Sequence, residues 1–98
     1  MSEEMESPGV VVLDAALDYR AAAPLRDAFL ERRGGPVLVD GANVETIGGL
    51  CLQVLLAARQ AWVSDHVSFT IAARSAAFDR GILGFGASAA LGLDAMSE

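Results

Sequence analysis

The chain has 98 residues, which is enough for one small domain with a single hydrophobic core. Its composition, 53% hydrophobic and 20% charged, is typical of a folded globular protein and excludes a disordered one. Seven basic residues, all arginine, stand against thirteen acidic ones, and the resulting net charge of −6 argues against binding to nucleic acid or to an anionic membrane surface.

The first residues, MSEEME, are acidic and lack both the basic start and the apolar stretch of a secretion signal. The longest uncharged stretches, Ile47–Ala58 and Gly81–Leu93, are shorter than the roughly 18–20 residues that a membrane-spanning helix needs. We therefore expect a cytoplasmic protein without direct membrane insertion. We expect residues 1–8 to form a flexible acidic N-terminus and residues 9–98 to form a single domain.

Three apolar runs predict β-strands. Val10–Leu13 is a continuous apolar run, which is typical of a parallel strand that is covered on both faces. Val37–Asp40 is a second short run of the same kind. Val67–Ile71 alternates apolar with polar residues, which predicts a strand near an edge of the sheet with one face open to solvent.

Between these runs the apolar residues recur with helical spacing. A first helix is predicted to begin near Ala21–Ala23 and to end before Gly34-Gly35-Pro36, because Pro24 fits only a first turn. The longest predicted helix covers roughly Ile47–Val63. Its core face is expected to consist of Ile47, Leu50, Cys51, Val54, Leu55, Ala58, Ala61 and Trp62.

The last third of the chain predicts a short helix from Ala76, capped by Ser75, and then a turn with a short final helix in residues 84–93. The element order β-α-β-α-β-α predicts an α/β fold with a single, mostly parallel sheet and with helices packed on one face. The residues expected to be buried are Leu13, Leu38, Val39, Ile47, Val54, Leu55, Phe69 and Ile71.

The side chains that carry chemistry do not form a catalytic or metal-binding set. Ser64, Asp65 and His66 are adjacent in one turn, whereas the members of a catalytic triad converge from separate elements. With one cysteine and one histidine, no zinc site is expected, and Cys51 is expected to be a small buried hydrophobic residue. Asp40, at the end of a strand, is either a functional carboxylate or a residue that fixes its loop. We expect no enzyme activity, cofactor or metal.

The segment DGANVETIGGLC, which begins at Asp40, resembles the STAS family, the fold of bacterial anti-sigma factor antagonists. The family pattern is an apolar strand ending in Asp, a small residue, a hydrophobic residue, and then Asp-Ser-Ser/Thr-Gly-Leu/Ile at the start of a helix. Asp40, Ala42 and Val44 match the first three positions, and Gly49-Leu50 match the Gly-Leu pair. The resemblance covers roughly residues 10–93 and implies one STAS-like domain.

The same segment departs from the family pattern at three positions. Thr46, Ile47 and Gly48 stand where the family has its Asp, its first Ser and its phosphoacceptor Ser or Thr. Because glycine has no hydroxyl, no phosphorylation is expected at Gly48, and Thr46 is the remaining local candidate. The role that we expect for Thr46 is instead to cap the helix. The first strand of many family members is missing here or reduced to residues 1–7.

The resemblance implies a non-enzymatic module that binds a kinase-like ATPase, a signalling protein or a transporter subunit through the loop and the start of the second helix. One setting is bacterial signalling, of the anti-sigma factor antagonist or chemotaxis type. The alternative is a cytoplasmic accessory subunit of a lipid-transport ATPase complex, and a further alternative is a small enzyme with an unrecognised site. The expected partner-binding residues are Val44, Glu45, Thr46, Ile47, Gly48, Gly49, Leu52 and Leu56.

An apolar stripe lies opposite the expected core face of the second helix. It consists of Leu52, Leu56 and Val63, with Arg59 beside them. One interpretation is that neighbouring helices cover this stripe. The other is that Leu52 and Leu56 stay exposed and dock a partner protein or a second copy of the chain.

Overall fold

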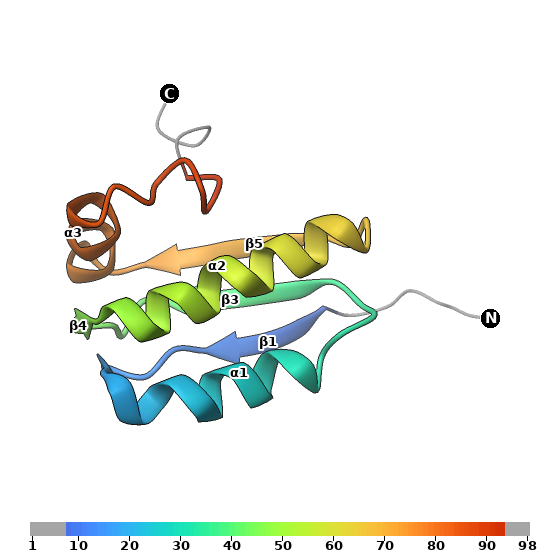
Figure 1. Cartoon of the computed structure of the whole chain (residues 1–98), viewed down its shortest axis with the longest axis horizontal. Helices are drawn as coiled ribbons and strands as arrows, with labels where there is room; N and C mark the ends of the chain where they lie inside the picture. The colour runs from blue at the N-terminus through green and yellow to red at the C-terminus, as the bar shows by residue number, and fades with distance from the viewer. Residues whose placement is uncertain (1–7, 94–98) are drawn as a thin grey trace.

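The computed structural model describes residues 8–93, and its centre is a parallel sheet (Figure 1). Strands β1 (Gly9–Val12), β3 (Val37–Gly41) and β5 (Phe69–Arg74) lie in the order β1-β3-β5. The predicted α/β fold with a mostly parallel sheet is confirmed, and so is the edge position of the third apolar run. The predicted flexible N-terminus, residues 1–8, and the predicted reduced first strand, residues 1–7, lie outside the described residues apart from Pro8, which is exposed.

Helices α1 (Ala22–Leu30) and α2 (Gly49–Ser64) run side by side across one face of the sheet, and α3 (Ala76–Gly84) lies beyond the carboxyl ends of the strands (Figure 1). A 3₁₀ turn, η1 (Tyr19–Ala21), precedes α1. Pro24 lies in the first turn of α1, where its missing N–H leaves no hydrogen bond unmade. Within the described range 8–93, no helix is long and apolar enough to cross a bilayer.

The sheet face that points away from α1 and α2 is open. Val10 and Val12 of β1 are 48% and 58% exposed, while Val11 between them is buried. The expectation that the run Val10–Leu13 is covered on both faces is therefore wrong. The physical reason is that α1 and α2 form one layer on a single face of the sheet, so alternate side chains of β1 point to solvent.

Two short strands were not predicted from the sequence. They are β2 (Ala16–Leu17) and β4 (Thr46–Ile47), which pair in parallel. The carbonyl of Ala15 accepts hydrogen bonds from the backbone N–H groups of Glu45 and Thr46, at 2.7 and 3.1 Å. A two-residue strand shows no periodicity in a sequence, but here it ties the segment before α1 to the segment before α2.

The core lies between the sheet and the helices. Trp62 of α2 is buried against the rings of Phe29 and Phe69, and its Nε1 donates a hydrogen bond to the carbonyl of Gly35 at 2.8 Å. Of the eight residues expected in the core, four are buried: Leu13, Val39, Leu55 and Ile71. The other four are only partly buried: Leu38, Ile47, Val54 and Phe69.

Helix α2 is rotated relative to the orientation expected from its periodicity. Leu52, expected on the exposed stripe, is buried, and Leu50, expected in the core, is 54% exposed. The expectation that Leu52 stays exposed is therefore wrong. The cause is the segment after α3, where Ala87, Leu91 and Leu93 are buried in the same core as Leu52.

The segment after α3 consists of turns, so the expected short final helix does not form. The backbone N–H of Leu91 donates to the carbonyl of Ala87, and the resulting single helical turn ends at Gly92, whose φ is +77°. Arg59 of α2 holds this turn in place, because its Nη1 donates to the carbonyl of Ala90 at 3.2 Å. The interpretation that the stripe on α2 is covered is thus correct for Leu52. Leu56 is partly buried, and Val63 is 55% exposed.

Candidate functional site at the start of the second helix

Three segments meet at the carboxyl end of the sheet: β2 with η1, β4 with the start of α2, and α3 (Figure 1). The carboxyl ends of parallel strands are where open α/β sheets carry their functional loops. The residues expected to bind a partner, from Val44 to Leu56, begin in this loop cluster and extend along α2. The local hydrogen bonds determine which of them reach the surface.

Hydrogen bonds from its own residues and from Ser75 fix the loop after β3. The carboxylate of Asp40 accepts a hydrogen bond from the backbone N–H of Ala42 at 3.0 Å. Val44 is buried, and its carbonyl accepts a hydrogen bond from the hydroxyl of Ser75 at 2.6 Å. The same hydroxyl accepts from the N–H of Phe78 at 2.9 Å, so Ser75 is also the predicted N-cap of α3. Asp40 therefore has the loop-fixing geometry, and Val44 is an anchor below the surface.

The N-terminus of α2 differs from the prediction. Its N-cap is Gly48, at φ −101° and ψ 172°, and no described side chain caps it. The prediction that Thr46 caps the helix is wrong, because Thr46 lies in β4 and is exposed. Pairing with β2 keeps the chain extended through Ile47, and the N–H of Gly48 still donates to the carbonyl of Leu17 at 2.9 Å.

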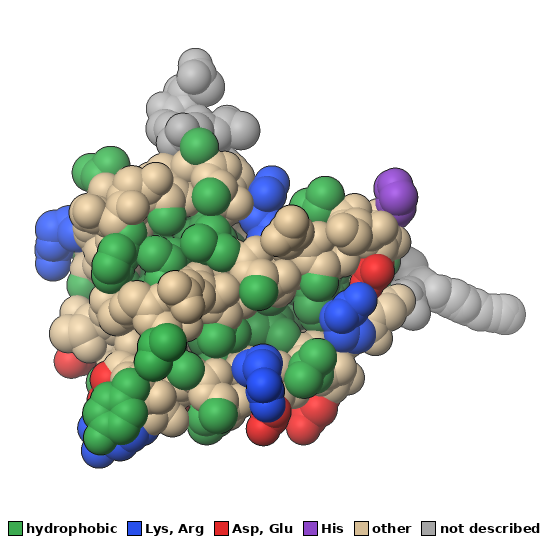
Figure 2. Space-filling view, in the orientation of Figure 1, with side chains coloured by type: hydrophobic (Ala, Val, Ile, Leu, Met, Phe, Trp, Pro, Cys, Tyr) green, Lys and Arg blue, Asp and Glu red, His purple; other side chains and the backbone are tan. Residues whose placement is uncertain are grey.

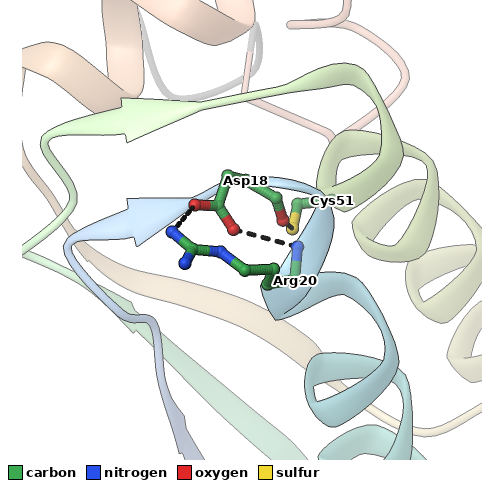
Figure 3. A network of polar contacts seen from close by, with 3 residues as sticks. All are labelled: Asp18, Arg20 and Cys51. Carbon is green, nitrogen blue, oxygen red and sulfur yellow. Dashed lines mark hydrogen bonds and ion pairs between the residues drawn. The ribbon is translucent and has the colours of Figure 1, made fainter.

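A small polar network joins η1 to the start of α2 (Figure 3). One carboxylate oxygen of Asp18 accepts from the backbone N–H of Arg20 at 2.9 Å, and the other accepts from its guanidinium at 2.8 Å. The thiol of Cys51 donates to the carbonyl of Asp18 at 3.3 Å. This network fixes the η1 turn against the first turn of α2.

The surroundings of Asp18 and Cys51 shift the pKa values of both groups. The hydrogen bond from the Arg20 side chain is the main reason why the pKa of the Asp18 carboxyl lies below its usual value. Burial raises the pKa of the Cys51 thiol, and the negative charges of Asp18 and Asp14 raise it further. Cys51 is thus a protonated, fully buried residue, as the sequence predicted.

The residues of this region that reach solvent are Glu45, Thr46, Gly49 and Leu50, which we call the loop–helix surface. Ile47, Gly48 and Leu56 are partly buried. Val44 and Leu52 support the surface from the core and do not lie on it. Tyr19, on the adjoining η1 turn, is 74% exposed and was not singled out from the sequence. The sequence signal for the exposure of Tyr19 was its position between two charged residues, Asp18 and Arg20.

The Ser64-Asp65-His66 segment is a helix terminus, at the other end of α2. His66 adopts a left-handed conformation with φ 59°, and its N–H donates to the carbonyl of Val63 at 3.1 Å. The carboxylate of Asp65 accepts a hydrogen bond from the guanidinium of Arg33 at 2.8 Å. These contacts agree with the expected polar turn. In the described part of the chain, no group of three or more His, Cys, Asp or Glu side chains is placed to hold a metal ion.

Comparison with known families adds one finding. The family model described as "Mlab, STAS domain" matches residues 2–92. Searches among curated proteins and among solved structures found no match. The matched range includes the sheet, all three helices described above and the loop–helix surface.

Proposed function

The chain belongs to the STAS family, and from this premise we propose that it is a non-enzymatic protein-interaction module that binds its partner at the loop–helix surface. The supporting observation is that this surface is preformed. Its exposed residues lie between two buried anchors, Val44 and Cys51, and each anchor is hydrogen-bonded to a different element. A preformed surface binds with a smaller entropic cost than a loop that must first be ordered.

The composition of the surface also supports a protein partner. It combines an apolar side chain, Leu50, with the exposed backbone at Gly49, and the aromatic side chain of Tyr19 adjoins it. Tyrosine is among the residues that contribute most to protein–protein binding energy. Glu45 is the one ionisable residue of the loop–helix surface. This arrangement suits a contact that buries apolar area around a few polar groups.

Regulation by phosphate at the family position is not available to this chain, because Gly48 has no hydroxyl. Thr46 is exposed two residues away, in β4, and is the nearest alternative hydroxyl. We propose that the module is constitutively competent to bind and that its regulation depends on the availability of its partner. Incubation with a cognate kinase should then give no mass gain of about 80 Da on the intact protein.

We place the module in a bacterial signalling pathway of the anti-sigma factor antagonist or chemotaxis type, with a kinase-like ATPase or another signalling protein as its partner. The accessory subunit of a lipid-transport ATPase is the alternative, with a transporter subunit as partner. Both settings use the same surface. Mass spectrometry of the co-purified partner distinguishes the two settings.

A substitution on the surface tests this proposal. Gly49→Glu places a carboxylate in open space at the N-terminus of α2, where the helix dipole favours it, so the variant should fold. The control is Gln60→Glu, which introduces the same charge at an exposed position about three turns further along the same helix. We expect the wild type and Gln60→Glu to co-purify a stoichiometric partner and Gly49→Glu to lose it. A partner retained by Gly49→Glu would place the interface elsewhere.

A further inference from the structure

A groove runs between α1 and α2 on the face of the molecule that is turned away from the sheet. The two helices lie side by side there (Figure 1), and apolar side chains gather over them (Figure 2). The groove has a volume of 390 Å³ and extends from Ala22 and Leu50, at the starts of the two helices, to Arg33 and Trp62 at their ends. We call it the α1–α2 groove.

The floor and rims of the α1–α2 groove are apolar. Phe29 and Trp62 form part of its floor, while Leu30 and Leu50 stand at its rims and are each 54% exposed. The exposed residues of α2 carry no charge, because the one charged residue of this helix, Arg59, is partly buried and donates to the carbonyl of Ala90. The depletion of charge around an exposed apolar groove is typical of the core of a protein interface.

The charges that line the groove have one sign. Among the described residues that line it, Arg26 and Arg33 are the charged ones, although the whole chain carries a net charge of −6. Arg33 is paired with Asp65 at 2.8 Å and lies over the ring of Trp62. Arg26 has only a loose contact with Asp27 at 3.7 Å, and its side chain is 67% exposed. Arg26 is therefore able to receive a carboxylate from outside.

We propose that the α1–α2 groove binds an amphipathic helix of a partner protein, with apolar side chains against Leu30, Leu50 and Ala57 and an Asp or Glu side chain over Arg26. A groove between two parallel helices is shaped for a third helix. A helix as long as α2, which has 16 residues, spans about 24 Å, so it would follow the groove along its length.

The charge distribution favours such a partner over a second copy of this chain. Two copies each carry a net charge of −6 and repel one another. The exposed residues of α2 that line the groove, including Leu50, Gln53 and Ala57, offer no carboxylate to Arg26 of another copy. The α1–α2 groove and the loop–helix surface share only Leu50, so variants at their other residues test the two proposals separately.

Selection from a displayed library of 16-residue helical peptides tests this inference. The peptides carry Leu on one face and randomised residues on both flanks. We expect the selected peptides to be enriched in Asp and Glu on one flank. When Arg26→Glu is the target of the selection, the enrichment should shift to Lys and Arg. The peptides selected on the wild type should bind Arg26→Glu at least about tenfold more weakly.

Two further variants locate the binding site. Ala57→Glu places a charge on an exposed groove position without removing a core side chain, and it should abolish peptide binding. Gly49→Glu, on the loop–helix surface, should leave peptide binding unchanged. The inference is overturned by an absence of selected peptides, by selection without a charge bias, or by peptides that still bind Ala57→Glu. Sedimentation showing a dimer of the wild type that Ala57→Glu dissociates would also overturn it, since a second copy would then be the occupant.

Discussion

Gly48 occupies the N-cap of α2, where a hydroxyl would have two effects. A side-chain oxygen at this position would accept a hydrogen bond from a first-turn N–H, and it would also be a phosphate acceptor beside the helix N-terminus. The surroundings leave room for it, because a Cβ at Gly48 would meet the carbonyl oxygen of Leu17 at 3.5 Å, an ordinary contact. The proposed loss of a phosphoacceptor at position 48 therefore depends on one residue and not on the shape of the site.

We predict that Gly48→Ser restores both properties. The free energy of unfolding should rise by a few tenths of a kcal/mol, the usual difference between Ser and Gly at an N-cap. Incubation with a cognate kinase should add about 80 Da to the intact variant and nothing to the wild type. Gly49→Ser, one residue further and also in open space, is the control and should gain neither property. Phosphate on Thr46 of the wild type would contradict the proposed constitutive binding.

His66 is a second position where one residue determines local energetics. It ends α2 in the left-handed conformation, which costs a residue with a Cβ about 1–2 kcal/mol. We predict that His66→Gly raises the free energy of unfolding by about 0.5–1 kcal/mol, because glycine adopts this conformation freely but loses more backbone entropy. Ser64→Gly is the matched control, since Ser64 is exposed and is the last residue of α2, where glycine should destabilise the protein. Urea unfolding measures both, and a destabilised His66→Gly would show that the histidine side chain has a role of its own.

At the scale of elements, the close approach of α3 to β4 supports the loop–helix surface. Gly81 lies inside α3, where glycine normally weakens a helix by about 1 kcal/mol relative to alanine. Here a Cβ at Gly81 would overlap Cγ2 of Ile47 in β4. Because Ile47 is branched at Cβ, its methyl group can move only by a change of the χ1 rotamer, so a side chain at position 81 must either force that change or push β4 and α3 apart.

We predict that Gly81→Ala lowers the free energy of unfolding by about 1–2 kcal/mol, since the overlap outweighs the gain in helix propensity. Gly84→Ala, at the end of the same helix and in open space, is the control and should be neutral or stabilising. The double variant Gly81→Ala with Ile47→Ala should cost less than the sum of the two single variants, as expected for residues in contact. Strict additivity in urea unfolding would show that the two residues do not meet.

The elements that the sequence predicted are those with a strong periodic pattern. The apolar runs of β1, β3 and β5 and the helical spacing in α1 and α2 identified them to within a few residues. Strands β2 and β4 were not predicted because a segment of two residues cannot show a period. Their pairing is the reason why Thr46 is not the cap of α2. The rotation of α2 was not predicted because a helical wheel contains no information on the turn at residues 87–93, whose buried residues belong to the same core as Leu52.

The position of the candidate site, at the start of α2, comes from the resemblance to the family and stays a prediction. The structure adds the exposure of its residues. Which of its residues are exposed depends on contacts with distant segments, such as the hydroxyl of Ser75 on Val44 and the carbonyl of Asp18 on Cys51. These contacts join residues 31 and 33 positions apart, so no local pattern in the sequence reveals them.

For the whole molecule, a single layer of helices on a single sheet means that stability depends on one core. Domains of this size are stable by only about 5–15 kcal/mol, so one large buried side chain accounts for a substantial fraction. Leu55 is fully buried at the middle of α2, within the core that also contains Val39 and Phe78. The open face of the sheet, with Val10 and Val12 exposed, contributes less burial.

We predict that Leu55→Ala lowers the free energy of unfolding by about 2–5 kcal/mol, through lost burial and the cavity left behind. Leu50→Ala is a matched control, because it is the same substitution in the same helix at a position that is 54% exposed, and it should change stability by less than about 0.5 kcal/mol. Val54→Ala, at a partly buried position, should lie between the two. Helix α2 carries both the core face and the surfaces proposed for binding. The ranking of the three stability losses in urea unfolding therefore shows which of these residues belong to the core. An equal loss from Leu50→Ala and Leu55→Ala would contradict the orientation of α2 and, with it, the exposure of Leu50 on which both binding proposals draw.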